Sequence, residues 1–471
     1  MAVHFLLRIG NSVETIIPLL YNTGMQKYTI AIIYLLISVY TGIAQCQSIA
    51  EDWKIVANDG SPDDFFSDSL DIDGGIIAVG SSSDRDNGIQ SGSAYLFDAI
   101  TGKQLFKLLP NDGSAYDFFA DSIAINQGLV IVGAEEHDSA NSNSGAAYVF
   151  DSATGLQISK LTPSDGAFSG RFGNAVDIDS GLIAIGARGD DDHGFFSGSV
   201  YLYNTQLGSE IYKLTASDGQ SLDQFGSAVA LNNGIVAIGA PGHDSNGDRA
   251  GAIYLFDVST GQQLMKIVRP NKGPHESLGS ELALGPDYVV STVYQTIGTM
   301  KTGKICVFRI DTGEQLYEIY PEHNQGENFD VAIGLDDDNL VVGLRYDTPL
   351  GTMVGSARLY SLETGMLMNS LSPSDGEEGD WFGHSIAIDG HQVIVGSVLD
   401  DDNGSNSGST YSFDIYCPAD LNSDGFLDLR DVSFFLAAFI SQNLFVDFND
   451  DGILNFFDIS AFLGAFSTGC P

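Results

Sequence analysis

The sequence predicts a mainly β protein, a seven-bladed β-propeller closed by its N-terminal strand and followed by a small α domain. Lysines at positions 54, 107, 160, 213 and 266 recur every 53 residues, and each opens the same unit. Each unit holds four short apolar runs separated by turns rich in Gly, Asn and Asp. Repeats of four short antiparallel strands at this period are typical of propeller blades.

The unit at 213–265 illustrates the expected strands. They are GSAVALN, GIVAIGA, GAIYLFDV and QQLMKIV, in chain order. The second, residues 235–240, is apolar throughout and suits a strand that is buried on both faces, whereas its neighbours alternate. Two degraded copies at 266–317 and 318–369, and a truncated copy at 370–416, bring the number of units to seven.

The two ends of the repeat region complement each other. The chain enters at Asp52 with DWKIVAND, which corresponds to a fourth strand, and the last copy ends after a third strand. We therefore expect a propeller over residues 52–416, in which the N-terminal strand completes the last blade and removes a free sheet edge. The alternative, an open solenoid, would need a cap at each end.

The charge of the chain limits the classes of partner that it can bind. The chain has 62 acidic and 20 basic residues and a net charge of -42. Binding to nucleic acid or to anionic membranes is therefore not expected. Partners should be cationic, neutral or bridged by metal ions.

The N-terminus has the features of an export signal. From Met25 a short basic region with Lys27 precedes an apolar run over residues 28–39 and the small residues Gly42–Ala44. We expect residues 1–44 to be a signal peptide, with translation starting at Met25, and the protein to be secreted or associated with the cell surface. An uncleaved anchor is the alternative, but the run is shorter than the ~20 residues of a membrane span, so no stable span is expected.

The four cysteines are few for an exported protein of this length. Cys417 and Cys470 bracket the C-terminal segment, which predicts a disulfide between them; two free thiols are the alternative. Cys306 lies in a strand-like run and should be a buried free thiol. Cys46 has no evident partner.

The repeats resemble the FG-GAP repeats of integrin α-subunit propellers. The resemblance rests on Phe225-Gly226, on Gly239-Ala240-Pro241 and on Tyr254-Leu255-Phe256, with variants in the other units. It implies the fold and leaves function open, since propellers host many unrelated functions. Integrin-type repeats bind calcium between their first and second strands, but that connection is short here, so this site is not expected.

Acidic residues gather instead in the loops between second and third strands, as in 81–88, 187–194 and 397–404. These loops and the connections between units should lie on the same rim. The rim is either a solvated surface, a set of weak calcium sites or a docking surface for a cationic partner. The calcium ligands to test are Asp84, Asp86 and Asn87, or Asp400 to Asp402, and the tripeptide Arg188-Gly189-Asp190 is short enough to arise by chance.

No catalytic constellation stands out in the repeats. His137 and His243 occupy equivalent positions, which repetition alone explains. The divergent fifth and sixth units make His275, Glu276, His323 and Glu327 the best candidates for a site, with sequence drift as the alternative. Exposed aromatic residues such as Phe195 and Phe196 would favour carbohydrate binding if they line a groove.

Two twelve-residue acidic loops near the C-terminus predict two Ca²⁺ sites. Each places oxygen donors at positions 1, 3, 5, 9 and 12, Gly at position 6, and a main-chain carbonyl at position 7, as calcium loops do. The predicted ligands are Asp420, Asn422, Asp424, Phe426, Asp428 and Asp431 in the first loop, and Asp447, Asn449, Asp451, Ile453, Asn455 and Asp458 in the second.

An apolar helix follows each loop, and none precedes the first. This duplicated loop–helix plan over residues 417–471, with Asp at position 12 and a Gly-Cys-Pro end, resembles a dockerin (EF-hand-like) domain of bacterial secreted proteins. The resemblance implies a cohesin-like or cell-surface protein partner, read by positions 10 and 11. Here these are Leu429, Arg430, Phe456 and Phe457 rather than the common Ser-Thr pair, which makes a standard cohesin doubtful.

The sequence as a whole favours a secreted, non-catalytic propeller that displays a binding face for a protein or glycan and is tethered through its calcium-dependent C-terminal module. The alternative is a polysaccharide-acting enzyme or carbohydrate-binding protein that takes part in polysaccharide catabolism. Such an enzyme should present two carboxylates at working separation in a cleft.

Overall fold

The computed structural model of the chain describes residues 48–49, 51–139, 141–166, 168–205, 208–244, 247–270, 275–297, 300–321, 331–336, 339–348, 353–421, 427–449 and 452–468. The expected signal peptide and Cys46 lie outside these residues. Within them, no helix is long and apolar enough to cross a membrane. Residues 46–416 cluster into one compact unit and residues 417–470 into another.

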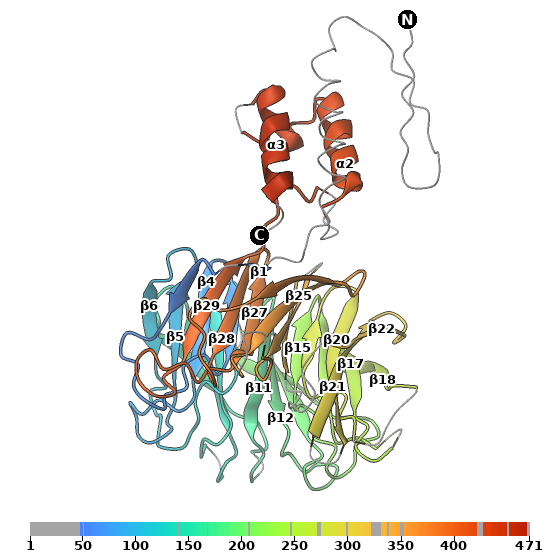
Figure 1. The fold of residues 1–471 in the computed structure, drawn as a ribbon. Helices are drawn as coiled ribbons and strands as arrows, with labels where there is room; N and C mark the ends of the chain where they lie inside the picture. The colour runs from blue at the N-terminus through green and yellow to red at the C-terminus, as the bar shows by residue number, and fades with distance from the viewer. Residues whose placement is uncertain are drawn as a thin grey trace, which may run out of the picture. The chain divides into compact units, whose positions relative to one another are not determined.

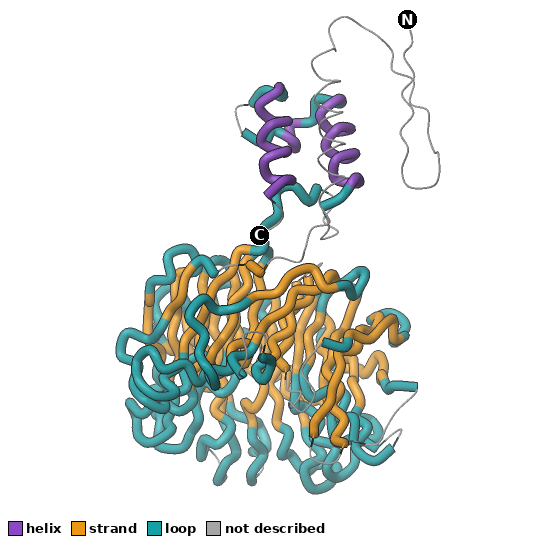
Figure 2. Tube along the Cα trace, viewed as in Figure 1, coloured by secondary structure: helices purple, strands orange, loops and turns teal. Residues whose placement is uncertain are grey.

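The first unit is a seven-bladed β-propeller, as the sequence predicts (Figures 1 and 2). Each blade is a separate sheet, and in blades 1–5 the sheet is antiparallel and its neighbouring strands follow one another in the chain. The first strand of each blade contacts the first strands of the blades before and after it, so that these inner strands form a closed ring.

The strands are given from the ring outwards. The inner strands of blades 1–7 are β3 (Leu70–Asp73), β7 (Ile123–Asn126), β11 (Phe172–Asp179), β15 (Val229–Asn232), β19 (Leu282–Leu284), β23 (Val331–Asp336) and β27 (Phe382–Asp389). The second strands are β4 (Ile76–Ser81), β8 (Leu129–Ala134), β12 (Leu182–Ala187), β16 (Ile235–Ala240), β20 (Tyr288–Ile297), β24 (Asn339–Leu344) and β28 (Gln392–Ser397). The third strands are β5 (Ser93–Asp98), β9 (Ala146–Asp151), β13 (Ser199–Asn204), β17 (Ala252–Asp257), β21 (Met300–Arg309), β25 (Ser356–Ser361) and β29 (Ser409–Asp414). The outer strands are β6 (Gln104–Leu108), β10 (Gln157–Leu161), β14 (Ser209–Leu214), β18 (Gln262–Ile267), β22 (Gln315–Ile319), β26 (Leu367–Leu371) and β2 (Trp53–Ile55).

The N-terminal segment closes the ring, and this prediction is confirmed. β2 pairs antiparallel with β29 and supplies the outer strand of blade 7. Directly before it, β1 (Ser48–Ile49) pairs in parallel with β26 and makes blade 6 five-stranded. The sequence did not predict β1. Together β1 and β2 cover the outer edges of two adjacent blades, which leaves fewer strand edges open to pairing with other chains.

The hydrophobic core lies between the blades. One cluster joins Leu96 and Leu108 of blade 1 to Val132 and Tyr148 of blade 2, and similar clusters recur at other junctions. The closing strand takes part, since Ile55 is buried with Ile77 of blade 1 and Ile394 of blade 7. Second and third strands are buried on both faces for this reason, which explains their unbroken apolar runs.

The Phe of each FG motif and the Gly that precedes each third strand meet at the blade junctions. Gly92 has φ +80° and lies so close to the next blade that an added Cβ would be 1.9 Å from the carbonyl oxygen of Phe119. Phe119 is fully buried and packs edge-on against Tyr148, with ring centroids 5.6 Å apart. The motif therefore fixes the spacing between neighbouring blades.

The second unit contains two helices, α2 (Leu429–Ile440) and α3 (Phe456–Thr468), with the 3₁₀ turn η1 (Leu444–Val446) between them. The rings of Phe435 and Phe462 stack with centroids 4.2 Å apart and join the helices. Asp428 caps α2 and forms a capping box with Asp431.

Candidate functional site

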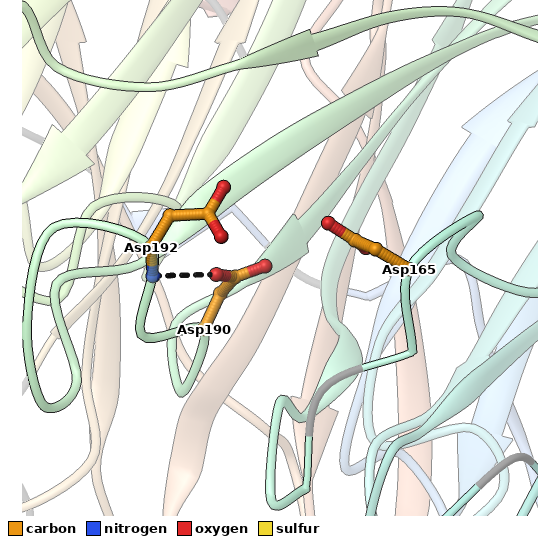
Figure 3. A group of neighbouring side chains, drawn as sticks. All are labelled: Asp165, Asp190 and Asp192. Atoms are coloured by element: carbon orange, nitrogen blue, oxygen red, sulfur yellow. Dashed lines mark hydrogen bonds between the residues drawn. The ribbon is translucent and has the colours of Figure 1, made fainter.

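Three carboxylates on the propeller rim surround a lysine. The carboxylates of Asp165, Asp190 and Asp192 face one another (Figure 3). Lys213 Nζ lies 2.5 Å from Asp165, 2.9 Å from Asp190 and 2.6 Å from Asp192. Tyr201 donates its hydroxyl to Asp165 and Asp190, and the ammonium lies 5.3 Å from the centroid of the Tyr201 ring. We call this arrangement a lysine cage.

Lysine cages recur in blades 1 and 7. Lys107 lies 2.7–3.0 Å from Asp59, Asp84 and Asp86, and Lys54 lies 2.5–2.9 Å from Asp375, Asp400 and Asp402. Burial alone would lower the pKa of each lysine, but its hydrogen bonds to carboxylates outweigh burial and raise the pKa.

In blades 2 and 4 a histidine and a serine stand at two of the three carboxylate positions of the cage. Lys160 Nζ lies 2.6 Å from Asp112 and 2.7 Å from His137 Nε2. An ammonium can only donate, so Nε2 accepts and Nδ1 carries the proton that His137 donates to Asp117 over 2.9 Å. Lys266 and His243 are 2.9 Å apart in the equivalent place. Both histidines thus belong to the cages.

The lysine cages include most of the residues that were predicted to bind calcium at the rim. Asp84, Asp86, Asp400 and Asp402 are lysine partners, so an ammonium already lies where a cation would be held. Calcium binding at the rim stays a prediction. The tripeptide at 188–190 is not an exposed ligand, because Arg188 pairs with Glu135 and Asp190 is buried.

A second charged cluster gathers where the inner strands begin. In blades 2 and 3, Arg188 Nη2 donates to both carboxylate oxygens of Glu135 at 2.9 Å, and Arg171 lies 3.5 Å from the same group. In blades 7 and 1, His384 Nε2 lies 3.1 Å from Asp68. The inner strands that these residues adjoin, β27, β3, β7 and β11, contact one another in this order around the ring.

Aromatic and acidic groups extend this cluster. Arg345 lies 2.8 Å from His384 Nδ1 and stacks over Trp381, with its guanidinium carbon 5.1 Å from the ring centroid. The Asp121 side chain is exposed, but desolvation by the atoms around it, and next the charges of Asp68 and Glu135, raises the pKa of its carboxyl to about 7. No hydrogen bond or ion pair of the Asp121 carboxylate is found in the described part of the chain.

Of the four candidate residues in the divergent units, the structure describes Glu276 and His275, and each has a separate partner. Glu276 is buried and pairs with Arg269, which also donates to Glu318 over 2.7 Å. His275 is exposed, 3.5 Å from Asp248. His323 and Glu327 lie outside the described residues. Cys306 is a buried free thiol, as predicted, and burial raises its pKa to about 12.

The predicted calcium ligands at position 12 of the C-terminal loops are fully buried. Asp431 accepts from the backbone N–H groups of Leu421 (3.0 Å) and Asp428 (2.9 Å). Asp458 accepts from the N–H of Asn455 over 2.6 Å through Oδ2. Its other oxygen, Oδ1, is buried and has no hydrogen-bond partner among the residues that the structure describes. A buried carboxylate oxygen without a donor is costly, and a bound cation would satisfy it, so these residues fit calcium.

The other predicted ligands are described in part. Asp447 Oδ2 accepts from the N–H of Gly452 over 2.7 Å, which is the turn expected at position 6. Asp420 donates its own N–H to the carbonyl of Cys417. Asn455 donates to the carbonyl of Ile453, the residue at position 7. Asn422, Asp424, Phe426, Asp451 and Cys470 lie outside the described residues, so the disulfide to Cys417 stays a prediction.

The predicted partner contacts of the C-terminal unit are at its surface. Leu429, Phe456 and Phe457 are exposed where the two helices begin. Arg430 is also exposed and donates to Asp428, directly before α2.

The sequence analysis missed both the cages and the inner-strand cluster. The cages carry a signal that could have been found, since Asp59, Asp84 and Asp86 precede Lys107 by 48, 23 and 21 residues, and Asp165, Asp190 and Asp192 precede Lys213 by the same distances. The inner-strand cluster has no such signature, because its charges differ from blade to blade.

Comparison with protein-family models matches the FG-GAP repeat to residues 50–97, 103–150, 156–203, 209–256 and 366–413. These segments make up just over half of the chain and leave out blade 5 and most of blade 6, where the repeats diverge. The search of curated proteins found no match. The chain belongs to the FG-GAP repeat family.

Proposed function

We propose that the protein is a secreted, non-catalytic propeller that displays a binding face and is tethered by its C-terminal unit. In this proposal the unit is a dockerin-like module that binds two calcium ions and docks on a cohesin-like or cell-surface protein. The predicted Cys417–Cys470 disulfide would hold its two ends together.

The observation that carries the proposal is the pair of acidic loops that each lead into a helix. Asp431 and Asp458, at position 12 of the two loops, are both buried at the start of their helices. Within the described part of the chain, one carboxylate oxygen of Asp458 has no donor. Such a burial is stabilising only when a cation offsets the charge, so calcium would complete the fold of this unit.

The surface of the C-terminal unit supports a docking role. Phe456 and Phe457 are exposed next to each other, with ring centroids 6.4 Å apart. Exposed aromatic side chains on so small a unit are typical of protein interfaces. Because they directly precede Asp458, calcium binding would fix their position.

The test is capture of envelope proteins from the producing organism by the immobilised full chain, with and without a calcium chelator. We expect one surface protein to be retained only with calcium, and to be lost with Asp458→Ala. Phe456→Ser combined with Phe457→Ser should bind calcium normally and still lose the protein. Equal capture with chelator present would contradict the tether.

The alternative function is action on polysaccharide. In this alternative Asp121, whose pKa is raised in part by the charge of Glu135, would act as the general acid and Glu135 as its paired carboxylate. Hydrolysis of a glycan by the full chain, abolished by Asp121→Asn, would establish this alternative and overturn the non-catalytic reading.

A further inference from the structure

Large apolar side chains are exposed at three consecutive blade junctions. They lie in the loops between second and third strands and in the connections between blades, from blade 1 to blade 4. They are between 51% and 71% exposed. We call the set the junction arc: Ile89, Tyr116, Phe168, Phe195 and Leu222.

The backbone fixes these loops to one another across the junctions. The N–H of Tyr116 donates to the carbonyl of Ile89 over 2.8 Å, and the N–H of Leu222 donates to that of Phe195 over 2.8 Å. Each bond joins one blade to the next, so the two side chains at a junction are held as a pair. The arc is thus presented on a rigid frame.

The fold does not need apolar residues at these positions. Tyr116 and Leu222 have φ of 69° and 71°, a conformation that is unfavourable for bulky residues. The equivalent residues are polar at the junctions of blades 7 and 1, of blades 2 and 3, and of blades 4 and 5: Asp63 (φ 63°), Ser169 (φ 55°) and His275 (φ 62°). The exposed bulky side chains of Tyr116 and Leu222 at strained positions therefore serve something other than folding.

Carboxylates accompany the arc. Asp86, Asp112, Asp165, Asp192 and Asp218 precede the five arc residues by three or four positions, in the same order. Each belongs to a cage and keeps close to half of its side chain exposed. Each arc residue thus has a partly exposed cage carboxylate three or four positions before it in the chain.

We propose that the junction arc is the display face of the propeller and docks an extended protein segment in which basic and apolar residues alternate. The inference rests on the proposed display function and names its partner class. Apolar side chains of the segment pack on the arc, and its Lys or Arg side chains pair with the outer faces of the cage carboxylates. The net charge of -42 steers such a partner to the protein.

A neutral glycan fits the same surface less well. It would remove water from the exposed sides of five cage carboxylates and add no positive charge beyond the cage lysines, which is costly. The arc also offers only two Phe and one Tyr, whereas a basic peptide satisfies both kinds of group.

The test uses the full calcium-loaded chain and a labelled peptide of alternating Lys and Leu. Peptides of alternating Lys and Ser, and of alternating Glu and Leu, are its controls. The arc variant combines I89S, Y116N, F168S, F195S and L222N. Asn is tolerated at positive φ, so this variant should fold with at least wild-type stability. The matched variant changes the same type of position outside the arc, with D63N and H275N.

We expect the Lys-Leu peptide to bind the wild-type chain at least about tenfold more tightly than the Lys-Ser peptide, and the Glu-Leu peptide not to bind. The arc variant should lose about tenfold or more in affinity for the Lys-Leu peptide, with an unchanged urea midpoint, and the matched variant should bind within about twofold of wild type. Affinity should fall as salt is added, because the pairing is electrostatic.

Equal binding of the Lys-Leu peptide by the arc variant and the wild-type chain would overturn the proposal. So would arc-dependent binding of oligosaccharides on a glycan array, or arc-dependent self-association in sedimentation, since each would assign the arc another occupant. Failure of the proposed tether can be told apart from failure of the junction arc. Peptide binding by the arc should persist in chelator and in Asp458→Ala, whereas the tether should be lost under both conditions.

Discussion

At the scale of single residues, the repeated lysines illustrate what a sequence pattern can and cannot tell. Their spacing defined the blades, but it did not show that Lys213 is surrounded by Asp165, Asp190 and Asp192. The cage carboxylates come from the connection between blades and from the loop between second and third strands. Only folding brings these segments to the lysine on the outer strand.

Replacing Lys213 by Met should destabilise the propeller. Asp190 is buried, and removing its cation leaves an uncompensated charge, so we expect the free energy of unfolding to fall by about 2 kcal/mol in urea titrations. Millimolar calcium should restore part of this loss, because three carboxylates then face an open position.

Lys103→Met is the matched control, since Lys103 is exposed and belongs to no cage in the described part of the chain. It should change stability by less than about 0.5 kcal/mol. If Lys213→Met were as stable as the wild type, or if calcium stabilised the wild-type rim equally, the lysine cages would not be the cation sites that we describe.

At the scale of elements, strand order and ring closure could be predicted because apolar periodicity and the truncated last repeat carry that information. The two-residue strand β1 could not be predicted, since so short a parallel pairing leaves no periodicity in the sequence. The junctions between blades could be predicted only in part. The FG and Gly motifs were visible, but their contact across the junction was not.

Two glycine substitutions test the junction contact. Gly92 and Gly74 both have positive φ, but an added Cβ meets the Phe119 carbonyl at Gly92 and nothing within 4 Å at Gly74. Gly74→Ala should lower the free energy of unfolding by about 1 kcal/mol, because alanine is strained at this positive φ. Gly92→Ala should cost about 3 kcal/mol or more, because the blades must separate.

Thermal and urea unfolding of the two variants measure this difference. Similar costs for Gly92→Ala and Gly74→Ala would mean that the junction relaxes easily, and the motif would then not set the blade spacing.

At the scale of the whole molecule, acidic groups dominate, and their environments differ. Burial raises the pKa of Asp71 to about 8 and that of Asp177 to about 6, and Asp121 reaches about 7. Hydrogen bonds from cage lysines and tyrosines outweigh burial and lower the pKa of Asp165 and Asp375. The carboxyls with raised pKa and the cage carboxylates with lowered pKa should therefore change the stability of the fold in opposite directions as the pH falls.

Stability should therefore rise as the pH falls from about 8 towards the ordinary carboxyl pKa of 3.8. In that window the folded chain keeps protons on Asp71, Asp121 and Asp177 that the unfolded chain has released, so acid favours the folded state. Below it, the cage carboxylates become protonated and their stabilisation is lost.

Urea unfolding at a series of pH values checks this sign. We expect a gain on the order of 2 kcal/mol between about pH 8 and pH 5, and a shallower rise for Asp121→Asn. The exposed Asp98, substituted by Asn, should leave the slope unchanged. A stability that falls steadily from pH 8 to pH 5 would contradict the raised pKa values of these three carboxyls.

For the candidate site, the C-terminal loops are the part that could be predicted from the sequence. Their ligand spacing could be read from the sequence because a calcium loop takes all its donors from twelve consecutive residues. The partner surface could not be predicted in the same way, because Leu429 and Phe456 are identified as contacts only by their exposure. The rim and the inner-strand cluster join residues far apart in the chain.

Counting bound calcium ions by titration calorimetry of the full chain tests the central claim, a calcium-ordered tether on a propeller whose rim is neutralised by lysine. The wild type should bind two ions per chain, Asp431→Ala and Asp458→Ala one each, and Asp86→Asn two. No binding, or a count that falls with Asp86→Asn and not with Asp458→Ala, would contradict the account.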